Sequence, residues 1–459
     1  MPEKKKKNVL IMGAAGMDFH LFNVYFKENP DFRVKCFTAT QIPFIENRHF
    51  PPELAGPLYP EGIPIYPEKV KEGGREVEKV PEYIKKFDIH VVVLAYSDLS
   101  HQEVMHRASI ANASGADFWL MSNTHAQLKS KKPVISICAT RTGCGKSQTT
   151  RFIASLLRER GYKVVVVRHP MPYDPDLTSQ ICQRFERYQD LDKYNTTIEE
   201  REEYEPHMDM GVVLYAGVDY KKILEEVEKE ADIILWDGGN NDIPFYKTDL
   251  HIVVTDPLRA GDEVSYHPGE VNLRAADVVV INKIDTAEIK AIMKVRENII
   301  GYNPKAKIVE TASPVVVDDF EKIKGKKVLV VEDGPTLTHG GMKFGAGYVA
   351  ALKYGAKEVV SPKPFAVGTI KETFEKYPHL ESILPAMGYS PEQRKELEET
   401  INRMRDEVEL VIAGTPIDLK RVINPEMEIV RARYSLAEIG KPTLTEIIEE
   451  FLKKLSETL

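Results

Sequence analysis

The stretch that decides the fold is Pro133–Leu157, "PVISICATRTGCGKSQTTRFIASLL". Its first residues are an apolar run that predicts a buried strand, and its last residues carry apolar side chains at helical spacing. The glycines between them allow a loop to curl so that several backbone N–H groups point inward, as a bound phosphate requires. A strand, a glycine-rich loop and a helix in this order predict a phosphate-binding P-loop.

The P-loop gives individual residues expected roles. Lys146 is expected to reach the β- and γ-phosphates of a nucleotide, and Ser147 to hold Mg²⁺. The common spacing of the motif has a glycine at position 140, where this chain has Thr140, so the loop Ala139–Ser147 is one residue longer. Cys144 would contribute its backbone N–H rather than its sulfur. The residues predicted to bind the nucleotide here are Thr142, Gly143, Cys144, Gly145, Lys146, Ser147 and Gln148.

Two later strand ends extend the predicted nucleotide site. The run "IILWDGGNND" places Asp237 at the end of a buried strand, which suits a carboxylate that holds Mg²⁺ together with Ser147. The run "VVVINKID" contains Asn282, Lys283 and Asp285 in the N-K-x-D pattern of GTPases, in which the carboxylate pairs with guanine. Since ATP-using proteins also carry this pattern, it predicts a purine pocket and leaves ATP and GTP open.

Composition limits the class of protein. A chain of 459 residues is too long for one core and predicts two or three domains. The net charge of -8 gives no support for nucleic-acid binding, and no apolar run reaches the roughly 18 residues of a membrane span, so neither partner is expected. The four cysteines show no paired spacing, which indicates a reducing, cytoplasmic compartment. Abundant Glu and Lys are typical of a thermophile.

The order of predicted elements indicates an α/β fold with three segments. Residues 1–130 alternate strands and helices as a Rossmann-like domain, 131–310 form the P-loop nucleotide-binding domain, and 311–459 form a C-terminal α/β segment that completes the substrate site. Near-continuous Val and Ile runs predict a mostly parallel sheet in the P-loop domain. Gly13 and Gly16 in "GAAGMD" indicate a tight turn, with a phosphate site as the alternative.

The final helix bears on assembly. Thr443 opens it with a capping-box pattern, and its apolar stripe favours core packing, with a subunit contact as the alternative. We expect a homo-oligomer, a dimer or higher.

Basic side chains at strand ends predict the substrate. Arg168 and His169 leave a strand next to the P-loop helix, at the carboxyl end of the sheet where α/β proteins bind ligands. Arg259 in "TDPLRAGD" has a similar place, and Arg141 lies inside the P-loop. Lys146, Arg168, His169, Arg259 and His339 are the predicted catalytic residues. For His339, in "EDGPTLTHGG", a surface turn is the alternative to an acid/base or phosphate-binding role. Such cations predict a small anionic phosphorylated metabolite as substrate.

The motifs together resemble known families. The long P-loop, the Asp-Gly-Gly strand end and the Asn-Lys box resemble the dethiobiotin-synthetase and ArsA-like branch of P-loop proteins. Over residues of about 130 to 440, the stretches "RHPMPYDPDL", "DGGNND", "TDPLRAGDE", "EDGPTLTHGGM" and "GTPIDL" resemble the archaeal cyclic 2,3-diphosphoglycerate synthetase family. This resemblance implies an ATP- and Mg²⁺-dependent synthetase that phosphorylates 2,3-diphosphoglycerate and closes it to the cyclic product, releasing ADP and phosphate.

A second class of function stays open at this point. The N-K-I-D pattern also suits a regulatory or metal-delivery GTPase that acts on a protein partner. The additional α/β segments and the arginines at strand ends favour a small-molecule pocket and therefore the synthetase.

Overall fold

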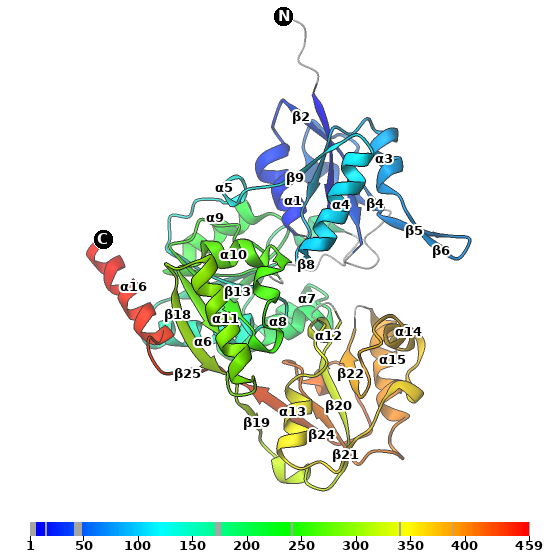
Figure 1. Ribbon diagram of the computed structural model, residues 1–459, viewed down its shortest axis with the longest axis vertical. Helices are drawn as coiled ribbons and strands as arrows, with labels where there is room; N and C mark the ends of the chain where they lie inside the picture. Colours follow the sequence, from blue (N-terminus) through cyan, green and yellow to red (C-terminus); the bar gives the residue numbers. More distant parts are fainter. Residues whose placement is uncertain are drawn as a thin grey trace, which may run out of the picture.

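The computed structural model describes residues 6–13, 16–40, 48–169, 176–239, 242–338, 341–388 and 390–458. These residues form three α/β units, with the P-loop domain between the N-terminal domain and a C-terminal unit (Figure 1). The predicted α/β fold class is therefore confirmed. Among the described residues, no helix combines the length and apolar character needed to cross a membrane.

The N-terminal domain is a parallel sheet covered by helices. Its strands are ordered β3-β4-β2-β1-β7-β9, and only β3 runs antiparallel to its neighbour, so this part has the predicted Rossmann-like arrangement. Its elements are β1 (Lys7–Met12), α1 (Met17–Leu21), the π-helical η1 (Phe22–Phe26), β2 (Phe32–Ala39), β3 (His49–Phe50), α2 (Pro52–Ala55), β4 (Ile63–Pro67), β5 (Lys69–Glu72), β6 (Arg75–Glu78), α3 (Val80–Lys86), β7 (Val91–Leu94), β8 (Leu99–Ser100), α4 (His101–Ala113), β9 (Asp117–Leu120) and α5 (Asn123–Ala126).

The P-loop domain is built on a longer sheet. Its order is β12-β13-β11-β14-β10-β15-β17-β18-β25, and every pairing is parallel except those of the two edge strands. The strands are β10 (Val134–Ala139), β11 (Val164–Arg168), β12 (Gln183–Phe185), β13 (Val213–Ala216), β14 (Ile233–Asp237), β15 (Leu250–Thr255), β17 (Val278–Ile281), β18 (Lys307–Ala312) and β25 (Ala437–Ile439). The helices and short elements around them are α6 (Lys146–Glu159), η2 (Leu177–Gln180), α7 (Tyr188–Lys193), α8 (Ile198–Asp209), α9 (Tyr220–Glu230), η3 (Pro257–Arg259), η4 (Asp262–Val264), β16 (Tyr266–His267), α10 (Gly269–Ala275) and α11 (Ile289–Tyr302).

The C-terminal unit has its own sheet, ordered β19-β24-β23-β20-β21, with β22 also paired to β20. It comprises β19 (Val315–Val317), η5 (Phe320–Lys322), β20 (Lys327–Asp333), α12 (Gly334–Leu337), α13 (Ala346–Lys353), β21 (Glu358–Val359), η6 (Lys363–Phe365), α14 (Gly368–Lys376), β22 (Ile383–Ala386), α15 (Pro391–Asn402), β23 (Leu410–Ala413), η7 (Leu419–Arg421) and β24 (Ile429–Tyr434). The chain then returns: β25 joins β18, and α16 (Leu444–Thr458) packs its apolar side chains into the P-loop domain's core. Residues 311–459 are thus divided between two units.

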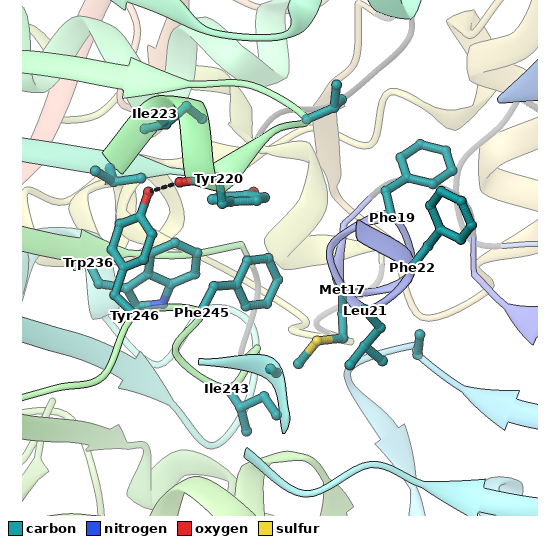
Figure 2. Packing of buried hydrophobic residues seen from close by; sticks show 14 of the residues in the cluster. Met17, Phe19, Leu21, Phe22, Tyr220, Ile223, Trp236, Ile243, Phe245 and Tyr246 are labelled. Carbon is teal, nitrogen blue, oxygen red and sulfur yellow. Dashed lines mark hydrogen bonds between the residues drawn. The ribbon is translucent and has the colours of Figure 1, made fainter. Parts of the chain in front are cut away.

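The N-terminal and P-loop domains share one hydrophobic core. Met17 and Leu21 of α1 belong to the same buried cluster as Trp236 and Phe245 of the P-loop domain, and Figure 2 shows the aromatic side chains of the P-loop domain gathered on the side toward α1. His20 stacks on Phe245 at 4.2 Å between ring centroids. Burial of this much apolar surface fixes the two domains against each other.

A short strand pair also crosses this junction. β8 of the N-terminal domain pairs antiparallel with β16 of the P-loop domain. The N-terminal domain therefore also contacts the segment between η4 and α10 of the P-loop domain.

Candidate functional site

The P-loop has the backbone that its glycines predict. β10 ends at Ala139, and α6 begins at Lys146. Gly143 and Gly145 have φ angles of 82° and 108°, in the left-handed region that favours glycine. A side chain at Gly145 would overlap the Asn282 amide. Glycine at this position is therefore needed both for the turn and for the close approach of β17's end to the loop.

A buried chain of charges lies beside the P-loop. The Lys146 ammonium donates to Asp237 Oδ1 and to the Gly238 carbonyl, each at 2.6 Å. Arg168 Nη1 lies 2.8 Å from Asp237 Oδ2, and its Nη2 pairs with Glu203 of α8. Asp237 is 0% exposed and Arg168 1%. Although burial acts to raise it, the charges of Arg168 and Lys146 hold the pKa of Asp237 well below its usual range.

The structure thus brings Lys146, Asp237 and Arg168 together, as the strand-end argument predicts. It also shows that the guanidinium of Arg168 is occupied by two protein carboxylates. The catalytic roles assigned to these side chains stay predictions. Among the described residues, no group of three or more His, Cys, Asp and Glu side chains is arranged to hold a metal ion.

The Asn-Lys box supports the loop. Asn282 Nδ2 donates to the Cys144 carbonyl at 2.9 Å, and Lys283 Nζ donates to the Gly143 carbonyl at 2.6 Å. Asp285 is exposed at the surface, and its Oδ1 accepts from the Ser313 N–H at 2.9 Å. Two of the box residues therefore shape the P-loop, and selection of the purine base by Asp285 stays a prediction.

Two arginines, Arg141 inside the P-loop and Arg259 after β15, hold the loop to neighbouring elements. Arg141 Nε donates to Asp98 of the N-terminal domain at 2.6 Å, its Nη1 pairs with Asp262, and its guanidinium lies over the Tyr266 ring. Arg259 Nη2 donates to the Thr142 carbonyl at 2.7 Å. Arg141 thus connects the P-loop to the N-terminal domain, and Arg259 lies against the loop as its sequence position suggested.

Of the two predicted histidines, only His169 lies among the described residues. His169 follows β11 and lies with its Nε2 3.7 Å from Asp242. Its ring occupies the space beside Gly16 and Gly239, where an added side chain would overlap it. The N-terminal turn after β1 therefore contacts the end of β11. His339 lies outside the described residues, as do Asn240 and Asn241.

A cavity opens from the P-loop toward the C-terminal unit. The P-loop side contributes the cations Arg141, Lys146 and Lys283, whereas α8 and the end of β20 contribute acids. The acidic residues that line it are Glu199, Glu202, Glu203, Glu332 and Asp333. Its apolar lining includes Leu258, Val315, Leu337, Met342, Phe344 and Val349. Thr336, just after β20, lies against Gly143, so the C-terminal unit reaches the P-loop itself.

Sequence reasoning missed the acids of α8. The helix reads "IEEREEYEPHMD", and Glu199, Glu202 and Glu203 recur at the i, i+3 and i+4 spacing that places side chains on one helix face. Most charged helix faces are solvated, so this signal alone does not distinguish a cavity wall from a surface. Glu332 and Asp333 begin the stretch "EDGPTLTHGG", in which the sequence predicts a role for His339 alone.

Glu332 gives a pH-dependent prediction for stability. It is 2% exposed, and burial raises its pKa to about 7, although backbone N–H groups such as that of Tyr348 act to lower it. The pKa of this carboxyl is about 7 in the folded protein and 4.5 in the unfolded chain. Its contribution to stability is therefore fully present below pH 4.5 and is lost as the pH rises through 7. Glu332→Gln should therefore raise the free energy of unfolding at pH 8 by up to about 3 kcal/mol, and by much less at pH 5.

Denaturant unfolding of both proteins at pH 5 and pH 8 measures this difference. Glu375→Gln, at an exposed position on α14, is the control and should change little at either pH. An equal effect of Glu332→Gln at both pH values would contradict the prediction.

No family model matches the chain. Arginine synthetase ArcE from Thermococcus kodakarensis is 63% identical over 453 residues, which are 99% of this chain and 98% of that protein. The chain belongs to this arginine synthetase family. Membership confirms the prediction of an ATP-dependent synthetase with a P-loop fold, and the enzyme class is no longer open.

More distant matches are also found. Cyclic 2,3-diphosphoglycerate synthetase from the same organism is 26% identical over 201 residues, 40% of this chain and 46% of that protein, so the chain matches about half the length of such relatives. The resemblance stated from the motifs is therefore to a related family, and the arginine synthetase family is the one that this chain shares over its whole length. Among solved structures, LpxK from Aquifex aeolicus with ATP aligns over 81% of this chain and 99% of that chain, with 13% identity and a TM-score of 0.43.

Proposed function

We propose that this protein is an ATP-dependent synthetase that forms arginine. The observation that carries the proposal is the cavity beside the P-loop, where five carboxylates face the space next to the predicted triphosphate site. A substrate or product with a positive charge fits such a wall, because the acids compensate its charge away from water. The relationship to arginine synthetase ArcE over nearly the whole chain supports the same conclusion.

The chemistry of such a reaction follows from the product. A guanidinium group differs from a ureido group by nitrogen in place of oxygen, so the ureido oxygen must be made a leaving group. Transfer of the γ-phosphoryl group of ATP to that oxygen forms an O–P bond, and ADP departs. Ammonia then attacks the carbon, the C–O bond breaks, and the oxygen leaves with phosphate. One proton of the ammonia passes to the phosphate, and the other two stay on the guanidinium.

Residues of the P-loop domain would serve the first step. Lys146 would neutralise the transferred phosphoryl group, and Ser147 and Asp237 would hold the Mg²⁺ that shields the phosphates. Both oxygens of Asp237 face protein cations, Lys146 and Arg168, so its Oδ1 would be free to hold Mg²⁺ once Lys146 turns to the phosphates. Arg168 would act indirectly, by holding the Asp237 carboxylate in position. ATP is the expected nucleotide, and GTP is the alternative that contact of Asp285 with a guanine base would favour.

Product analysis tests the proposal. Purified protein is incubated with Mg²⁺, L-citrulline and ammonium, with either ATP or GTP. Arginine is measured by mass spectrometry, with ADP or GDP and phosphate measured by ³¹P NMR. We expect arginine, nucleoside diphosphate and phosphate in equal amounts, and only when citrulline and ammonium are both present. Nucleotide hydrolysis that is independent of citrulline, with no arginine formed, would refute the proposal and favour a GTPase-type activity.

Formation of cyclic 2,3-diphosphoglycerate is the second candidate, favoured by the partial match to those synthetases. The same assay with 2,3-diphosphoglycerate in place of citrulline and ammonium tests it. We expect no cyclic product, because a polyanion would meet the acids of α8 and β20 and because Arg168 is already paired.

We also propose that the enzyme is a homo-oligomer and works in the cytoplasm. Light scattering of the purified protein measures the mass of the assembly.

A further inference from the structure

The glutamates of α8 divide into two groups by their partners. Glu200 caps the helix by accepting from the Thr197 N–H at 2.9 Å. Glu203 pairs with Arg168, and Glu205 lies 3.2 Å from Arg421. The remaining two, Glu199 and Glu202, line the cavity, and no ion pair with a described cation holds either of them.

Glu199 and Glu202 are buried with unused acceptor atoms. They are 1% and 4% exposed. Oε1 of Glu199 accepts from the Gly388 N–H at 2.9 Å, whereas its Oε2 has no hydrogen-bond partner among the described residues. Oε1 of Glu202 accepts from the Thr415 hydroxyl, whereas its Oε2 has no hydrogen-bond partner among the described residues, and the charge of Asp333 acts on Glu202. Two buried carboxylates without a cation are unfavourable unless a ligand supplies one.

The nearby cation Arg394 forms no ion pair with Glu199 within the described part of the chain. Arg394, whose charge acts on Glu199, donates to the Thr196 carbonyl at 3.1 Å. Burial raises the pKa of Glu199 to about 7, against the weaker opposite effect of Arg394, and it raises that of Glu202 well above its usual range. The cavity therefore presents buried acidic oxygens that the described residues leave without hydrogen-bond partners.

The shape and lining of the cavity specify the kind of cation. Glu199 and Glu202 lie one turn apart on the same helix face, so their oxygens can accept from two sides of a planar donor. Apolar side chains such as Leu337, Met342 and Phe344 line the same cavity and suit an aliphatic stem. A guanidinium presents five N–H donors in a plane and is more weakly hydrated than an ammonium, so it suits buried carboxylates best.

We propose that Glu199 and Glu202 of α8, with Asp333 at the end of β20, form the subsite that binds the guanidinium group of an amino acid. This assignment rests on the proposed function for the identity of the amino acid. The subsite lies where the P-loop domain meets the C-terminal unit, so both units contribute to it. The acids compensate the charge of the guanidinium form, whereas a neutral ureido group gives them no charge to balance.

Calorimetric binding to the full chain, without turnover, tests the subsite. The ligands are L-arginine, agmatine and L-citrulline, and the proteins are wild type, Glu199→Gln, Glu202→Gln and the double variant. We expect the double variant to bind arginine and agmatine about 10- to 100-fold more weakly, with citrulline changed less than about threefold. Binding of an ATP analogue should be unchanged. Glu225→Gln, on an exposed face of α9, is the matched control and should bind all ligands as wild type does.

Each other outcome overturns the subsite. Arginine affinity that is unchanged in the double variant, or arginine and citrulline weakened equally, removes the assignment to the guanidinium. Wild-type protein that binds neither arginine nor agmatine does the same. Thermal unfolding of the variants checks the fold, and the single variants provide the comparison if the double variant is unfolded.

Binding and turnover separate this proposal from the proposed function. If wild type forms arginine but the variants bind it normally, only the subsite fails. If wild type forms no arginine, yet binds agmatine in a way that requires Glu199 and Glu202, only the proposed function fails.

Discussion

Replacing Lys146 by alanine is expected to lower the rate of arginine formation by about 10³-fold while leaving the protein folded. The ammonium is the buried cation at the start of α6, between the P-loop and Asp237. In the reaction it would balance the charge of the phosphoryl group during transfer, and alanine offers no replacement. Steady-state release of phosphate and arginine, with ATP and citrulline saturating, measures the loss.

The fold should survive this change because Asp237 keeps other partners. Arg168 stays 2.8 Å from its Oδ2, and His207 Nε2 lies 3.5 Å from the same oxygen. The thermal midpoint of Lys146→Ala should therefore stay near that of wild type. Lys290→Ala, at an exposed position on α11, is the control and should keep full activity. Near-normal activity in Lys146→Ala would remove the P-loop from the reaction.

Much of this site could be predicted from local sequence. A strand, a glycine-rich loop and a helix specify the P-loop because each residue's role depends on its close neighbours in the chain. Asp237 and Arg168 were found by the same reasoning, since buried Val and Ile runs mark parallel strands whose carboxyl ends meet at one edge. Their pairing in adjacent strands, β11 and β14, follows from that rule.

What local sequence could not give is the partner of each charge. Arg168 appears in the sequence as a free cation at a strand end, and only the position of α8 shows that Glu203 neutralises it. From the sequence, the basic side chains at strand ends predict an anionic substrate. The structure shows that acidic side chains of the protein balance the charge of such residues, as Glu203 does for Arg168. Glu199 and Glu202 reach the cavity because α8 packs between the two units, which is a long-range consequence of the fold.

The same limit applies to the domain boundaries. The return of β25 and α16 to the P-loop domain depends on pairing between strands more than 100 residues apart, as with Glu310 and Ile439. The apolar stripe of α16 predicted that it would pack against something, and only the structure identifies the P-loop domain's core as its partner. The hydrophobic periodicity of a helix indicates which of its faces is buried, but it does not identify the element that covers that face.

Replacing Arg168 by alanine is expected to destabilise the protein by about 3–5 kcal/mol, because Asp237 and Glu203 would lose their shared cation. The guanidinium is 1% exposed and lies between the two carboxylates, so water cannot take its place without opening the site. Denaturant unfolding of wild type and variant measures the loss. Arg403→Ala, which removes an exposed pair with Glu399, is the control and should cost less than about 1 kcal/mol.

The double variant Arg168→Ala, Glu203→Ala separates pairing from packing. Removing Glu203 as well eliminates one of the two acids that Arg168 pairs with, and Asp237 keeps Lys146, so we expect the double variant to recover part of the lost stability. If Arg168→Ala instead keeps wild-type stability and loses only affinity for an anionic substrate, the guanidinium is free in solution to bind that substrate. One of the two arguments against a polyanionic substrate, the pairing of Arg168, would then fail, and the cyclic diphosphoglycerate reaction would gain support.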